Sequence, residues 1–187
     1  PGAVPPDPTR GYKVNLIVDN TGLQNAPTVI ESSPTHNKLF GYSEKEVRFG
    51  TLFTDYTMIR GGSAHRANGG FLVIEAERLL ADPFAYQALK QTVQQKKLTV
   101  EEPAARFDFM VTKTLHPEPV PFDCKIVLMG SPQLYDLLFS YDQEFRELFK
   151  VKADFDVIMD RTEENIRRYA SFICTLCKKE GLRHLEP

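Results

Sequence analysis

One stretch of the chain decides the fold: it reads Gly69-Gly70-Phe71-Leu72-Val73-Ile74-Glu75-Ala76. Four consecutive apolar residues after a glycine pair fit a β-strand that is buried on both faces, as strands are in a parallel sheet. Glu75 closes the apolar run, so its carboxyl group is expected at the carboxyl end of that strand. In open α/β folds, ligands bind outside this end of the sheet. The stretch therefore predicts an α/β domain with a ligand site beside Glu75.

Size and composition are those of a globular domain. The chain has 187 residues, enough for one domain with a real core, and 42% of them are hydrophobic and 26% charged. A net charge of −2 does not favour general binding to nucleic acid, which needs a basic surface. No apolar run approaches the roughly 20 residues that span a bilayer, and no secretory signal is visible. Three cysteines do not indicate a disulfide framework, so a cytoplasmic location is expected.

Strands and helices are expected to alternate through most of the chain, which favours the α/β class. Three helices have clear start signals, with Asp82 and Ser131 each preceding a proline and Thr162 preceding two glutamates. The helix after Asp82 is expected to end near residues 96–97 and to bury a stripe of Phe84, Ala88, Leu89 and Val93, with Lys90 elsewhere. Strands are expected at 12–19, 27–31, 98–100, 107–112, 125–129 and 154–159, with shorter helices ending near 40 and spanning 144–149.

Three stretches together resemble a known family. Residues 69–76 resemble the Walker B segment of AAA+ ATPases, and the lead-in His65-Arg66-Ala67-Asn68-Gly69-Gly70 is similar to that of LonB-like ATP-dependent proteases. Residues 117–123 and 149–156 agree with the same group. The resemblance covers roughly residues 12–185. It implies a partial AAA+ core with a central, mostly parallel sheet, flanking helices, and a β-hairpin inserted between the Walker B strand and the next buried strand.

The resemblance also implies an organisation of the chain. Residues 1–11 carry four prolines and are interpreted as a linker or a cut end. Residues 12–160 would form the AAA+ α/β core without its phosphate loop, because no Gly-x-x-x-x-Gly-Lys-Ser/Thr pattern occurs. Residues 161–187 would form a helix that begins the helical lid.

Two candidate residues lie at the ends of the buried strands. Glu75 would hold Mg²⁺ on the phosphates, although a solvated carboxylate at a strand end is the plainer interpretation. The usual second acidic residue is replaced by Ala76, which cannot polarise water. Ser131 aligns with the sensor position, or it simply caps the following helix. No catalytic residue is therefore assigned within this chain.

The remaining candidates are cations and aromatic residues. Lys150, with Arg146 nearby, matches the arginine that a neighbouring subunit normally supplies, and both are otherwise surface charges. Phe53 and Tyr56 fit a pore loop that grips unfolded protein, or they are core residues of a strand. The pair Cys174 and Cys177 is interpreted as core cysteines, because a zinc site wants four ligands.

Three functional hypotheses remain open. In the first, the chain is the ATPase module of a Lon-like serine protease. That protein would assemble a homo-oligomeric, hexameric ring, handle unfolded protein substrates, and use ATP and Mg²⁺ with weak or absent hydrolysis. Its Ser-Lys protease would lie in a separate domain. In the second, the chain is a stand-alone, nucleotide-free interaction domain. In the third, it is a working ATPase whose site is completed by sequence elsewhere.

Overall fold

The computed structural model describes residues 9, 12–48, 51–100, 115, 117–156 and 158–183. The chain divides into two compact units, residues 1–150 and 151–187, and each is described by itself. The domain boundaries expected from the sequence, after residues 11 and 160, stay predictions. Among the described residues, no helix is both long and apolar enough to cross a membrane.

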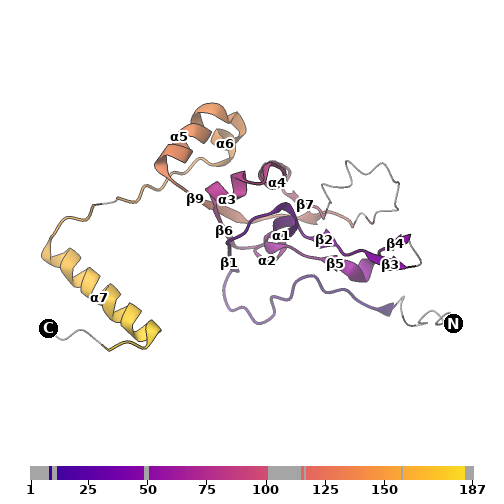
Figure 1. Ribbon diagram of the computed structural model, residues 1–187, viewed down its shortest axis with the longest axis horizontal. Helices are drawn as coiled ribbons and strands as arrows, with labels where there is room; N and C mark the ends of the chain where they lie inside the picture. Colours follow the sequence, from indigo (N-terminus) through magenta and orange to yellow (C-terminus); the bar gives the residue numbers. More distant parts are fainter. Residues whose placement is uncertain are drawn as a thin grey trace. The chain divides into compact units, whose positions relative to one another are not determined.

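The first unit is built around a three-stranded parallel sheet (Figure 1). The strands β1 (Thr28–Glu31), β6 (Phe71–Glu75) and β9 (Lys125–Met129) lie in the order β1-β6-β9, so β6 is central. The register sets Val29 beside Leu72 and Leu72 beside Ile126. The α/β class and the strands expected at 27–31, 71–75 and 125–129 are therefore confirmed.

Glycine is required at both positions before β6 for steric reasons. Gly69 adopts a φ of +83°, which side chains disfavour, and its N–H donates to the carbonyl of Asp123 at 2.8 Å. A Cβ atom at Gly70 would overlap the backbone of Pro27. The first residue of β6 can pair with β1 only because the backbone passes so close, and the Phe71 N–H donates to the Pro27 carbonyl at 2.8 Å.

One face of the sheet is buried under four helices. Leu72 and Ile74 of β6 are 0% exposed, and full burial of such side chains stabilises a fold by about 1.5–3 kcal/mol each. The covering helices are α1 (His36–Phe40), α2 (Ser63–Arg66), α3 (Ala76–Leu80) and α4 (Pro83–Gln95). Their core residues are Leu39, Phe40, Ala64, Ala67, Leu79, Ala85 and Leu89.

The opposite face of the sheet is exposed. Of the side chains that alternate with the buried ones, Ile30, Phe71, Val127 and Met129 are each more than a third exposed, while Val73 on the central strand is half-buried. The prediction that residues 71–74 are buried on both faces is therefore wrong for this structure. The physical reason is that the helices of the described residues cover one face only.

Helix α4 begins as expected and buries most of the expected stripe. The Asp82 carboxylate accepts the N–H groups of Phe84 and Ala85, and its other oxygen accepts the N–H of His36 at the start of α1. Helix α4 ends at Gln95, and the next residue, Lys96, has a φ of +54°. Leu89 is buried, and Ala88 and Val93 pack against the core, as expected. Phe84 is half exposed and Lys90 is buried, so the expectation is wrong at these two positions.

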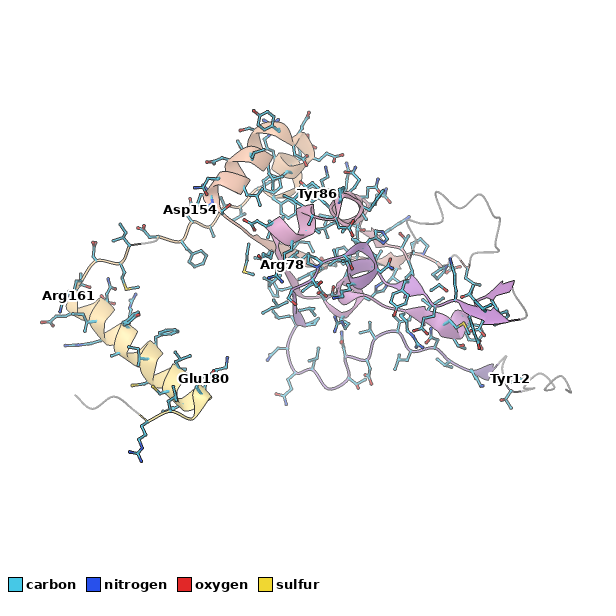
Figure 2. All side chains as sticks on the ribbon, in the orientation of Figure 1. Tyr12, Arg78, Tyr86, Asp154, Arg161 and Glu180 are labelled. Carbon is cyan, nitrogen blue, oxygen red and sulfur yellow. The ribbon has the colours of Figure 1, made fainter. Side chains whose placement is uncertain are left out.

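Lys90 is buried because it has acidic partners. Its side chain is 9% exposed, and its Nζ lies 3.0 Å from Asp142 Oδ2 and 2.6 Å from Glu144 Oε2. Tyr86, labelled in Figure 2, donates its hydroxyl to the same Asp142 oxygen at 2.7 Å. Burial alone would lower the pKa of Lys90, but the two carboxylates raise it. The ammonium group therefore stays charged in the folded protein.

This cluster attaches a helix pair to α4. Asp142 lies between α5 (Pro132–Tyr141) and α6 (Gln143–Leu148), and its carboxylate caps α6 by accepting the Phe145 N–H. The two helices pack through aromatic rings, with Tyr135 and Phe145 edge to face. The orientation of the pair thus depends on a nearly buried charge. The helices expected after Ser131 and around 144–149 are both confirmed.

Short antiparallel strands occupy the regions between the main elements. Strand β2 (Tyr42–Ser43) pairs with β5 (Ile59–Arg60), and β3 (Glu46–Arg48) pairs with β4 (Thr51–Phe53). Strand β7 (Lys97–Leu98) pairs with β8 (Val120–Pro121). This last pair closes the base of the segment where a hairpin insertion was expected. The predicted strand at 107–112 lies outside the described residues.

Two expected strands are absent. Residues 13–19 form no ladder, although Asn15 Nδ2 donates to the carbonyls of Tyr56 and Ile59 at 2.8 and 3.0 Å. Residues 154–156 and 158–159 are likewise not a strand, and Phe155 and Ile158 are exposed. Both segments have β-branched and aromatic residues, but strand propensity gives no strand without a pairing partner.

The second unit contains one long helix, α7 (Glu163–Glu180). Thr162 caps it by accepting the Asn165 N–H, as the sequence predicts, and Gly181 ends it with a φ of +65°. Cys177 is buried, whereas Cys174 is exposed, so the prediction of a core position is wrong for Cys174. Both cysteines are free thiols.

The Lys90 cluster gives a stability prediction. Lys90→Met keeps the apolar stem but leaves Asp142 without its ammonium partner, so we expect a loss of about 1–3 kcal/mol in the free energy of unfolding. Urea unfolding followed by circular dichroism measures it, because the chain has no tryptophan. Arg60→Met is the control: it removes an exposed ion pair with Glu44 and should change stability little. Equal effects of the two variants would contradict the prediction.

Candidate functional site

The carboxyl ends of the three parallel strands meet at one edge of the sheet. Strand β1 ends at Glu31, β6 at Glu75 and β9 at Met129, and Glu75 lies beside Met129 in the register. Helix α3 begins at Ala76 with no intervening loop. Its first turn therefore lies directly at this edge, where α/β proteins bind ligands.

Arg78 connects the ends of β1 and β6. Its Nε lies 2.8 Å from Glu75 Oε2, and its Nη1 donates to the carbonyl of Ser32 at 2.6 Å. Figure 2 labels Arg78 on the helix that follows β6. Both side chains of the ion pair are about half exposed, so water weakens the attraction between them. The Glu75 carboxylate nevertheless has a cation of the protein as its neighbour.

Glu77 connects α3 to the end of β9. Its Oε1 accepts the Ser131 backbone N–H at 2.9 Å. A Cβ atom at Gly130 would lie 3.3 Å from Glu77 Oε2 and 3.3 Å from Ala76 Cβ, so this turn packs closely against α3. The N–H of Ser131 lowers the pKa of Glu77 below its usual value, and the group is a carboxylate at neutral pH.

The first turn of α3 thus links the ends of all three strands. Glu75 is held toward β1 by Arg78, and Glu77 is held toward β9 by Ser131. Carboxylate oxygens are ligands for hard cations and acceptors for a water O–H. Within the described residues, no three or more His, Cys, Asp or Glu side chains are grouped so that they could hold a metal ion. The edge can therefore offer carboxylate oxygens and backbone polar groups to a ligand.

Two of the predicted site residues are brought together at this edge. Glu75 ends β6, and Ser131 follows the neighbouring strand β9. The Ser131 hydroxyl accepts the Leu134 N–H at 3.4 Å, so the N-cap interpretation is confirmed. Ala76 is buried against Gly130. The roles of Glu75 as a metal ligand and Ser131 as a sensor stay predictions.

The two predicted cations lie on another part of the unit. Arg146 belongs to α6, where its guanidinium lies over the Phe139 ring at 5.8 Å from the centroid. Lys150 follows α6, and both side chains are exposed. They belong to the α5–α6 pair and not to the α3 edge. A role toward a neighbouring subunit stays a prediction for both.

Phe53 and Tyr56 lie in a third location. Phe53 ends β4 and is half-buried, and Tyr56 begins the short 3-10 turn η2 (Tyr56–Met58) with its ring partly exposed. The β3–β4 hairpin is drawn away from the three-stranded sheet in Figure 1. Substrate handling by these residues stays a prediction.

His65 stabilises a turn. It lies in α2 with its ring buried, and its Nδ1 accepts the Gly62 N–H at 3.2 Å. Burial lowers the pKa of His65 to about 4. The ring is therefore neutral near pH 7.

A separate hollow lies at the other end of β1. Its volume is about 450 Å³, and it is lined by Arg66 and by residues between Ile17 and Val29. None of the predicted site residues lines it. The candidate site is therefore the strand edge rather than this cavity.

Sequence reasoning missed Glu77 and Arg78. The spacing of Glu75 and Arg78 is an i,i+3 pair, which indicates a contact only if a helix begins immediately after the strand. The sequence gives no cap residue of the usual type at this point, since Glu75 itself is the N-cap. The sequence therefore did not show where α3 begins, and the contacts of Glu77 and Arg78 could not be predicted without that position.

Comparison with known proteins agrees with this geometry. A family model described as "LonB-like, AAA domain" matches residues 24–156. A relative in Escherichia coli strain K12, described as "Putative Lon protease homolog", is 33% identical over 94 residues. That alignment covers 46% of this chain and 14% of the relative, so the chain spans a small part of the length of the protein it matches.

The buried His65 makes stability depend on pH. Its folded pKa is lowered, so stability is present above the unfolded pKa of about 6.5 and is lost as pH falls toward 4. We expect about 2 kcal/mol less stability at pH 5 than at pH 7, measured by urea unfolding. His65→Gln keeps an acceptor for Gly62 and does not titrate, so most of this difference should vanish. An unchanged difference in the variant would refute the assignment to His65.

Proposed function

Since the chain belongs to the LonB-like AAA domain family, we propose that it is the ATPase module of a longer Lon-like ATP-dependent serine protease. Its task there is ring assembly and the handling of unfolded protein substrates. The observation that carries the proposal is the strand edge of a family-matched domain, where Glu75 ends β6 and Ser131 follows the end of the adjacent parallel strand β9. Proteolysis itself belongs to a separate Ser-Lys domain of the parent protein.

AAA domains in general bind nucleotide with Mg²⁺. The carboxylates of Glu75 and Glu77 at the edge suit a hard cation, and in the parent protein Glu75 would hold Mg²⁺. When bound, Mg²⁺ neutralises charge on the phosphates of ATP. Ser131 would face the terminal phosphate, and Lys150 or Arg146 would reach the nucleotide of a neighbouring subunit.

We infer that hydrolysis by this module is weak or absent. Ala76 has no carboxylate, Ser131 is a short side chain already used as a helix cap, and Lys150 lacks the planar fork of arginine. A well-placed acid or base contributes about 10²–10⁴-fold to a rate, so each departure is large. Binding of nucleotide without rapid turnover still supports the assembly of a ring.

Phe53 and Tyr56 are proposed to contact the unfolded substrate. Proteins of the Lon-like family are generally oligomeric and act on protein substrates. Tyr56 presents a partly exposed ring next to the β3–β4 hairpin, and an aromatic side chain gives apolar contact without sequence preference.

A nucleotide-free interaction domain is the second candidate. The observation in its favour is the ion pair of Arg78 with Glu75, because a protein cation already balances the charge of the predicted metal ligand. Because Arg78 already balances the negative charge of Glu75, Mg²⁺ is less required to neutralise this carboxylate. Tight binding of Mg-ATP by the intact protein would argue against this candidate.

The first test is the behaviour of the intact parent protein. We expect native mass spectrometry to show a closed ring and degradation assays to show cleavage of an unfolded protein, with ATP bound but turned over slowly. A protein that stays monomeric and degrades nothing would refute the proposed function. A ring that binds no nucleotide would favour the interaction domain.

The second test concerns substrate contact. Tyr56→Ala removes the exposed ring, and we expect the rate at which unfolded protein is degraded to fall several-fold while the ring stays intact. Tyr12→Ala is the control, because Tyr12 is also an exposed tyrosine of the same unit. Equal rates for wild type and Tyr56→Ala would exclude a gripping role for Tyr56.

A further inference from the structure

The missing carboxylate at position 76 has a structural explanation. Ala76 is buried, and its Cβ lies against the turn at Gly130. Ala76 is 5% exposed, so a glutamate at this position would either bury its carboxylate or require its surroundings to rearrange. The fold therefore does not offer position 76 as a place for an acidic side chain that faces a ligand.

The next residue of α3, Glu77, does carry a carboxylate at this edge. Its side chain is exposed, and its carboxylate lies beside Gly130 and accepts the Ser131 N–H at 2.9 Å. A carboxylate has about four lone-pair positions, so one hydrogen bond from Ser131 leaves capacity to accept another from water. Glu77 is thus a solvent-accessible acceptor, fixed in position, at the end of β9.

The carboxylates of Glu75 and Glu77 differ in surroundings. Glu75 is paired with Arg78, which also binds the carbonyl after β1. Glu77 is hydrogen-bonded at the other strand end, next to the residue proposed to face the terminal phosphate. A group that orients attacking water must lie beside that phosphate, and Glu77 is the carboxylate of α3 on that side.

We propose that Glu77 is the carboxylate that orients the attacking water in this module. The inference rests on the proposed function, in which Ser131 lies at the sensor position. The water oxygen forms a bond to the terminal phosphorus, and the bond from that phosphorus to the bridging oxygen breaks. The electron pair of the broken bond stays with ADP. Glu77 accepts the hydrogen bond of the water, and the water proton leaves with inorganic phosphate or to solvent.

The test is Glu77→Gln in the intact parent protein. Glutamine keeps the shape and an oxygen that can accept the Ser131 N–H, but it loses the charge. We expect kcat for ATP hydrolysis to fall about a hundredfold or to background, while KM for ATP changes less than about threefold. If Glu77 only held the turn before α5 in place, kcat would stay unchanged in this variant.

Glu31→Gln is the matched control. Glu31 ends β1 at the same edge of the sheet, and its Oε1 accepts the Ser33 N–H at 3.0 Å. The hydrogen bond is therefore of the same kind, but it lies at the far strand. We expect turnover by this control to stay within about twofold of wild type.

Three results would overturn the inference. The first is unchanged turnover in Glu77→Gln, and the second is a wild-type protein with no hydrolysis above that variant. The third is a large gain of turnover in Ala76→Glu, which would place the required carboxylate at position 76. Ring assembly and protein degradation are measured separately, so the proposed function can survive each of these results.

Discussion

The central position of β6 between two parallel partners is the constraint on which the first unit depends. Leu72 and Ile74 can be completely buried only if the strand lies between β1 and β9 with its helices on that face. The close approach of Gly70 to Pro27 sets the start of the strand, and the register then fixes Glu75 at its end. The helices α1 to α4 gain their core contacts from this one arrangement.

The direct passage from β6 into α3 decides the character of the strand edge. Because no loop connects the strand to the helix, the second and third residues of α3, Glu77 and Arg78, lie at this edge and link it to the two outer strands. Arg78 provides Glu75 with a positive neighbour, and Ser131 fixes Glu77. The same few residues therefore set both the geometry of the edge and its balance of charge.

The sequence predicted those parts of the fold that have local signals. The apolar runs of β6 and β9 and the caps at Asp82, Ser131 and Thr162 are short patterns with direct physical causes. The strands expected at 12–19 and 154–159 failed because pairing is not local. Lys90 was placed on the wrong face because its acidic partners lie some fifty residues away. Glu77 was missed because its contact with Ser131 depends on where α3 begins.

The antiparallel pair of β7 with β8 has a consequence for variation in chain length. Because Lys97–Leu98 and Val120–Pro121 close on each other, the connection between α4 and β9 is anchored at its base. Doubling the length of a flexible loop costs only about 0.6 kcal/mol in closure entropy. Natural insertions and engineered reporter tags should therefore be tolerated between these two strands, while a single residue added between β6 and α3 should not.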